Sequence, residues 1–167
     1  MKVCIHPIAT ITKTSGLDGN VRLRPLSRYF DDYIEKNRLM LGNTSEHSEI
    51  VRLELILGLG KKRQFKFSGV NTASDAKRII GQTLFAQADA DDNINLISKD
   101  LLGYSIVTDS GLFVGELKDV MWLPNNDAYV IQNEGKEYLI PIIPEVIKKL
   151  DHKLKRVVIT PMDGLLD

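Results

Sequence analysis

Apolar and polar residues alternate in short segments along most of this chain, and no other feature constrains its fold more. In residues 20–27, Val21 and Leu23 fall on one side of an extended strand, while Arg22 and Arg24 fall on the other. The same alternation recurs in further segments: 49–58, 63–70, 103–111, 113–124, 128–136, 137–143 and 156–162. Because strands and long helices do not alternate, the sequence argues against the parallel sheet of nucleotide-binding folds.

Helices are expected to be few and short. Residues 71–81 carry the clearest signals, because Thr72 or Asn71 can cap a helix and Asp75 follows Thr72 at the spacing of a capping box. Residues 28–37 allow one or two helical turns. Residues 144–151 begin with a proline and carry Lys148 and Lys149 near their C-terminal end, so we predict a short helix there as well.

An acidic stretch divides the chain. Residues 86–96 interrupt the apolar pattern with small and acidic side chains, and the aspartates among them repel one another. We therefore expect an extended, solvated linker there. The pattern lacks the central glycine and the distal glutamate of a calcium-binding loop. The five strands and the small helix predicted after the linker are typical of a small barrel.

The two halves carry opposite charge, although the formal net charge of the whole chain is zero. Residues 1–90 hold 14 basic and 9 acidic side chains, a formal charge of +5, whereas residues 91–167 hold 8 and 13, a formal charge of −5. The first half therefore favours phosphates and the second a basic protein. Drift in the composition of two small domains is the simpler alternative.

Patterns typical of enzymes and metal sites are absent from the sequence. A single cysteine, Cys4, excludes an intramolecular disulfide, and His6, His47 and His152 are scattered outside any catalytic or ligand motif. We predict no catalytic residue, no cofactor and no metal. No apolar run is long enough to span a membrane, and the N-terminus is a poor signal peptide, so we expect a cytoplasmic protein.

Several basic side chains form candidate contacts for RNA. Gly58 and Gly60 precede three basic residues, but a strand follows them, so we predict a hairpin with a basic tip and not a phosphate loop. A strand in the first half adds further arginines on its polar side. The RNA-binding candidates are Arg22, Arg24, Arg28, Lys61, Lys62 and Arg63. A solvated strand face remains the alternative for the arginines.

The ordered motifs of the chain resemble the ribosome maturation factor RimM family. In the second half the resemblance rests on KDLLGYSIVTDSGLFVGELKDV, EYLIPIIPEVIKKLD and PMDGLLD. In the first half it rests on TKTSGLDGNVRLRPLS and FSGVNTASDAKRIIGQTLF. The resemblance implies an N-terminal RimM-type barrel and a C-terminal PRC-type barrel. We thus predict an all-β fold of two small β-barrels joined by a short linker, with one or two short helices.

The predicted domains follow from this reading. The first barrel is expected over residues 1–88, the linker over 89–95 and the PRC-type barrel over 96–167. Two departures from the family pattern stand out. Aromatic residues usually precede the D-L-x-G motif, but this chain has Leu96, Ile97 and Ser98 there. The phenylalanine of the I-P-F block is Ile142. At the C-terminus we expect the closing leucines to fold back onto the second barrel.

The resemblance implies a non-enzymatic assembly factor. The family binds the immature small (30S) ribosomal subunit near its head, contacts small-subunit ribosomal protein nineteen and promotes processing of 16S rRNA. We expect this chain to share these partners, as a monomer without a membrane attachment. The candidates for contact with the protein partner are Leu96, Ile97, Asp100, Leu101, Gly103, Pro141, Ile142 and Pro144. The alternatives are an rRNA-processing enzyme on a small barrel scaffold and a PRC-type adapter protein.

Overall fold

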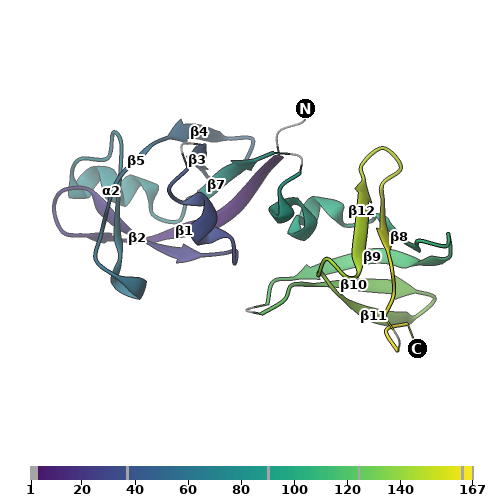
Figure 1. The fold of residues 1–167 in the computed structure, drawn as a ribbon. Coiled ribbons are helices and arrows are strands. Elements are labelled where there is room, and N and C mark those ends of the chain that lie inside the picture. The colour runs from purple at the N-terminus through teal and green to yellow at the C-terminus, as the bar shows by residue number, and fades with distance from the viewer. Residues whose placement is uncertain (1–3, 37, 90, 124, 163, 167) are drawn as a thin grey trace. The chain divides into compact units, whose positions relative to one another are not determined.

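The chain folds into two compact units, residues 1–92 and 93–167 (Figure 1). The structure is a computed structural model that describes residues 4–36, 38–89, 91–123, 125–162 and 164–166. Each unit contains one sheet and its own buried apolar core. The division falls inside the stretch 89–95 that the sequence analysis expects to be a linker.

The first unit is built on a curved antiparallel sheet in the order β4-β3-β7-β1-β2-β6-β5. Strands β4 and β5 form its two edges, although only Arg52 separates them in the chain. The sheet therefore curls back on itself into a half-barrel. Its strands are β1 Cys4–Ser15, β2 Asn20–Pro25, β3 Leu39–Gly42, β4 Ser48–Val51, β5 Leu53–Leu57, β6 Gln64–Phe67 and β7 Thr83–Ala88.

Short helices accompany this sheet: α1 Phe30–Tyr33, the 3-10 turn η1 Gly60–Lys62, and α2 Ala73–Ile79. The predicted cap of α2 is confirmed, because the Asp75 backbone N–H donates to the Thr72 hydroxyl at 3.1 Å. The Asp75 carboxylate accepts in return from the Asn71 backbone N–H at 3.2 Å. At Gly19, the loop before β2 approaches the backbone of Val70 and Asn71 closely. A Cβ there would lie 2.2 Å from the Val70 carbonyl oxygen, so only glycine fits.

The second unit contains a sheet in the order β11-β10-β9-β8-β13-β12. Strands β8 and β13 pair in parallel, and the other neighbours are antiparallel. Two 3-10 turns, η2 Asn93–Ile97 and η3 Lys99–Leu101, precede the sheet. The strands are β8 Ser105–Thr108, β9 Phe113–Met121, β10 Ala128–Asn133, β11 Lys136–Pro141, β12 Ile147–Asp151 and β13 Arg156–Ile159.

One predicted helix is wrong, and one predicted strand is divided in two. Residues 144–151 do not form a helix, since 147–151 is strand β12, which pairs with β13. Pairing with a neighbouring strand outweighs the weak helix signals of so short a segment. Residues 49–58 are mostly strand as predicted, but they are divided at Arg52 into β4, which pairs with β3, and β5, which pairs with β6. The Arg52 carbonyl there accepts from the Ser68 backbone N–H at 2.9 Å.

Three strands lack the alternation that predicts strands. In β7, Leu84, Phe85 and Ala86 are buried in succession, because this strand lies inside the sheet between β3 and β1. Strand β1 carries Pro7 beside a shift of register, where a proline is tolerated. Strand β3 has only four residues, LMLG. These strands are recognised only from their pairing.

The acidic stretch is exposed at Asp89, Asp91 and Asn93, as its composition predicts, but its later residues are not extended. Asp92 accepts hydrogen bonds within the first unit, and Asn93–Ile97 forms η2 with Ile94 buried in the second. With the division after Asp92, the first unit holds 14 basic and 11 acidic residues and the second 8 and 11. The opposition of charge thus remains, at +3 and −3.

Candidate functional site

A cavity in the first unit brings together three of the predicted RNA-binding residues. Its volume is about 510 Å³. Arg24 enters it from β2, Lys61 from η1, and Arg63 from the start of the β6 segment. The remaining lining residues are Leu23, Pro25, Phe30, Gly60 and Phe65. The predicted hairpin with a basic tip is confirmed, since β5 and β6 pair antiparallel on either side of η1.

Arg63 is held in place on several sides. Its Nη1 donates to the Asp31 carboxylate at 2.9 Å, and its Nε donates to the Gly60 carbonyl at 3.1 Å. The guanidinium carbon lies 5.5 Å from the ring centre of Phe30 and 5.6 Å from that of Phe65. These two rings are nearly buried and meet edge to face, so they form a firm support.

The other predicted RNA-binding residues lie outside this cavity lining. Arg22 is half-buried on β2, where it faces Lys13 of β1 in the strand register. Arg28 is exposed in the turn before α1, with its guanidinium 5.8 Å from the Tyr29 ring. Lys62 is exposed next to Lys61. Whether any of these side chains contacts RNA stays a prediction.

Two of the predicted protein-binding residues belong to the core of the second unit. Ile97 is 2% exposed and Leu101 is 1% exposed, so their side chains are not available to a partner. The structure thus places both side chains in the core, and contact of their backbone with a partner stays a prediction. Their apolar side chains, together with Ile94, fix the turns η2 and η3 against the second sheet.

The start of the second unit is attached to strands β9 and β10 by aromatic donors. The Trp122 Nε1 group, just after β9, donates to the Ile97 carbonyl at 3.0 Å. The Tyr129 hydroxyl on β10 donates to the Leu96 carbonyl. The side chain of Leu96 is half-buried. This arrangement could not be predicted from the sequence, because it depends on contacts between residues distant in the chain.

The other predicted segment reaches the same end of β10. Pro141 faces Ala128 in the register of β10 and β11, and the Ile142 N–H donates to the Asp127 carbonyl at 2.8 Å. Ile142 is half-buried and Pro144 is exposed. The structure thus connects Leu96 and residues 141–142 to one short stretch, residues 127–129. This end of β10 is the candidate contact region for a protein.

The remaining candidates lie between these segments in the chain. Asp100 is exposed in η3, and its backbone N–H donates to the Ser98 hydroxyl at 3.2 Å. Gly103 is exposed with φ +92, and its N–H donates to the Leu117 carbonyl at 2.9 Å. Gly103 therefore serves the turn into β8. Contact of either residue with a partner stays a prediction.

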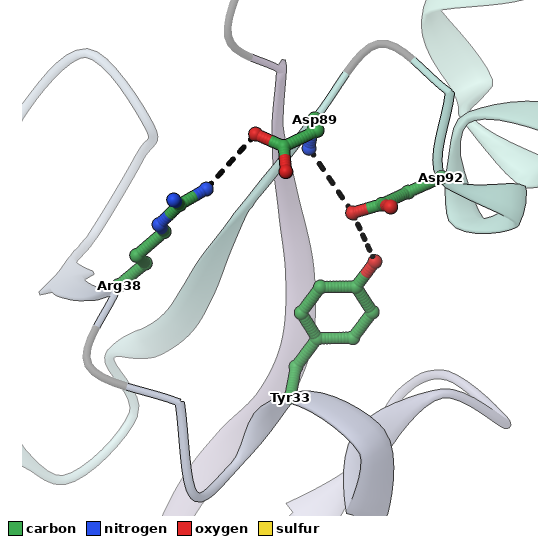
Figure 2. A network of polar contacts seen from close by, with 4 residues as sticks. All are labelled: Tyr33, Arg38, Asp89 and Asp92. Atoms are coloured by element: carbon green, nitrogen blue, oxygen red, sulfur yellow. Dashed lines mark hydrogen bonds and ion pairs between the residues drawn. The ribbon is translucent and has the colours of Figure 1, made fainter.

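A polar network closes the first unit around the end of β7, as Figure 2 shows. The Tyr33 hydroxyl donates to the Asp92 carboxylate at 2.9 Å, and the Asp89 backbone N–H donates to the same oxygen at 3.0 Å. Arg38 pairs with the Asp89 carboxylate at 2.9 Å. The bond from Tyr33 is the main cause that lowers the pKa of Asp92. Burial is the main cause that raises the pKa of Tyr33, and the hydrogen bond to Asp92 raises it as well.

Metal clusters and membrane helices are both lacking among the residues that the structure describes. No group of three or more histidine, cysteine or acidic side chains is placed to hold a metal ion there. Within the same residues, no helix has the length and apolar character needed to cross a bilayer.

Comparison with known proteins gives a consistent assignment for both units. A family model described as the RimM N-terminal domain matches residues 6–91, and one described as the RimM PRC barrel domain matches residues 98–165. The ribosome maturation factor RimM of Thermoanaerobacter sp. (strain X514) is 29% identical over 165 residues, which cover 96% of this chain and 98% of that protein. That of Staphylococcus haemolyticus (strain JCSC1435) is 28% identical, with the same coverage.

Two solved structures are also similar to this chain. The crystal structure of a RimM protein from Pseudomonas aeruginosa is 16% identical, with a TM-score of 0.45, and the match covers 95% of this chain and 98% of that one. The solution structure of the N-terminal domain of RimM from Thermus thermophilus is 15% identical, with a TM-score of 0.37. That match covers 52% of this chain and 89% of the other. The matches to the family models, with the mostly β structure, confirm the predicted fold class.

Proposed function

The chain belongs to the RimM family of ribosome maturation factors, and we propose that it binds the immature small (30S) ribosomal subunit and promotes the processing of 16S rRNA. One observation carries this proposal beyond family membership: the grouping of Arg24, Lys61 and Arg63 around one cavity of the first unit. Such a group offers a positive surface to an RNA backbone.

The two units divide the work in this proposal. The first unit, with its excess of basic residues, contacts 16S rRNA. The second unit, with its excess of acidic residues, contacts a basic protein of the subunit head, small-subunit ribosomal protein nineteen. Opposite charges steer the encounter and set the orientation of the partners. The end of β10, with Pro141 and Ile142 beside it and Pro144 following in the chain, supplies apolar surface for the protein contact.

The proposed action is binding without catalysis. The factor holds an RNA segment and a ribosomal protein until later assembly steps proceed, and it then leaves the finished particle. An rRNA-processing enzyme would cut its substrate unaided. Purified protein incubated with precursor rRNA and magnesium distinguishes the two, because cleavage by the protein alone would contradict a binding role.

Co-sedimentation tests the proposal directly. The protein is expected to sediment with free, immature small subunits and not with complete ribosomes. Binding should weaken steeply as salt rises, since it depends on phosphate contacts. A Lys61→Glu variant should bind the subunit less tightly than the wild type. Equal binding to immature subunits and to complete ribosomes would contradict the proposal.

A pull-down with purified small-subunit ribosomal protein nineteen tests the second unit. Ile142→Ala removes apolar surface beside the end of β10 and should weaken binding. Leu154→Ala removes a side chain that is 59% exposed in the turn between β12 and β13, away from that segment in the chain, and serves as the control. Equal losses for both variants, or no binding by the wild type, would argue against this contact.

A further inference from the structure

The cavity of the first unit has the properties of a site for one nucleotide. Its volume of about 510 Å³ lies in the range of small-ligand sites. Leu23 and Pro25 give it an apolar wall, while Arg24, Lys61 and Arg63 give it three cationic groups. We propose that it binds a single unpaired nucleotide of an RNA strand. This inference rests on the proposed function for its choice of RNA.

Arg63 is the surface for the base. Two of its N–H groups are already bonded, to Asp31 and to Gly60, and the rings of Phe30 and Phe65 support it. About a quarter of the side chain, 26%, is exposed, and it lines the cavity. A guanidinium plane stacks well on a nucleobase. Because this plane is held before binding, little side-chain entropy is lost when a base lies on it.

Arg24 and Lys61 are the partners for phosphate. Both side chains are exposed, and neither forms an ion pair with any residue that the structure describes. Arg63 differs from them, since Asp31 already balances its charge at 2.9 Å. Different residues of the site therefore contact the base and the phosphates. A neutralised planar group contacts the base, and two unpaired cations contact the flanking phosphates.

The nucleotide must be unpaired. A base inside an A-form duplex is stacked and paired, so it cannot enter a cavity of a protein. Duplex RNA can meet only the exposed cations. A free mononucleotide lacks the phosphate of the next residue and can engage only part of the cationic pair. The combination of base surface and two phosphate partners therefore favours a single strand.

Binding of fluorescently labelled RNA by the full-length protein tests this site. An unstructured single strand is compared with a hairpin duplex and with the same strand carrying an abasic position. Arg24→Gln and Lys61→Gln should each weaken single-strand binding about three- to tenfold and reduce its salt dependence. Lys77→Gln is the matched control, because Lys77 is exposed on α2 and does not line the cavity. Its effect should stay below about twofold.

Arg63→Lys tests the base contact, since it keeps the charge and removes the planar group. It should weaken binding of the intact strand about tenfold and leave binding of the abasic strand nearly unchanged. Thermal melting confirms that each variant is folded. Equal losses for Lys61→Gln and Lys77→Gln would overturn the inference, as would equal affinity for duplex and single strand. Displacement of the strand by equimolar nucleoside monophosphate would also overturn it.

The outcomes separate this site from the proposed function. If the wild-type protein sediments with immature subunits but does not bind single-stranded RNA, the nucleotide site is contradicted and the proposed function is not. If it binds the single strand through Arg24, Lys61 and Arg63 but does not bind the subunit, the proposed function is contradicted and the nucleotide site is not.

Discussion

The two units hold the two ends of the segment that joins them by different chemistry. The first unit uses charged and polar groups at its surface: Tyr33 and the Asp89 N–H bond to Asp92, and Arg38 pairs with Asp89. The second unit buries Ile97 and Leu101 and adds neutral donors from two aromatic side chains. One attachment therefore depends on a carboxylate and the other on apolar packing.

This difference has a physical consequence. Attachment by a carboxylate responds to pH and to salt, because its strength depends on charge. Attachment by buried apolar groups and neutral hydrogen bonds has no charge that pH can titrate or that salt can screen. The acidic residues that suggested a solvated linker thus form an end of the first unit whose attachment depends on pH. The apolar residues that follow form the start of the second unit, and their attachment does not depend on pH.

The strongest test of the comparison is Leu101→Ala. This side chain is 1% exposed, so its truncation should lower the free energy of unfolding of the second unit by about 2–5 kcal/mol. Leu102→Ala is the control, since Leu102 is 43% exposed and should cost less than about 0.5 kcal/mol. Urea unfolding followed by the fluorescence of Trp122 measures this unit, because Trp122 is the single tryptophan of the chain. Similar losses for both variants would contradict the buried role.

A pair of tyrosine variants compares the two attachments directly. Tyr33→Phe removes the hydroxyl that bonds to Asp92, and Tyr129→Phe removes the hydroxyl that bonds to the Leu96 carbonyl. Tyr33→Phe should cost about 1.5–3 kcal/mol, because its partner is charged, and Tyr129→Phe about 1 kcal/mol. Hydrogen exchange at the Asp89 amide measures the loss in Tyr33→Phe, and chemical unfolding measures the loss in Tyr129→Phe. A larger loss for Tyr129→Phe would reverse the comparison.

The pH dependence of the Tyr33→Phe and Tyr129→Phe variants gives a second comparison of the two attachments. The Tyr33 bond lowers the pKa of Asp92 in the folded protein, so this carboxylate stabilises the fold above its unfolded pKa of about 3.9. That contribution is lost as pH falls through the lower folded pKa. The difference between wild type and Tyr33→Phe should therefore shrink below about pH 4. The effect of Tyr129→Phe should stay constant across the same range, and a parallel decline would refute the distinction.

The smallest effect is expected from Arg38→Ala. The Arg38 and Asp89 side chains are 56% and 58% exposed, so their ion pair is screened and should contribute less than about 0.5 kcal/mol. Arg52→Ala, which removes an exposed arginine with no ion pair to a described residue, is the matched control. Thermal melting at low and high salt compares them. A loss for Arg38→Ala above about 1 kcal/mol would show that the network of Figure 2 acts as a cooperative unit.

Much of the architecture was open to prediction because it depends on local pattern. Alternation located most strands of the second unit, and the Thr72 cap with Asp75 located α2. The helix predicted over residues 144–151 was wrong because a short segment carries helix and strand signals of similar strength. Only the pairing with β13 decides between them. Strand β7 was missed since a strand buried on both faces has no alternation to detect.

The sequence alone determined the strand-rich class, the division into two units of opposite charge, and the basic tip between β5 and β6. Each of these depends on side-chain order or on simple totals. Only the tertiary structure decided which basic residues share a cavity, that Arg63 is neutralised by Asp31, and that Ile97 and Leu101 are core residues. Burial and pairing arise between residues far apart in the chain, and a linear pattern carries no information about which of them will meet.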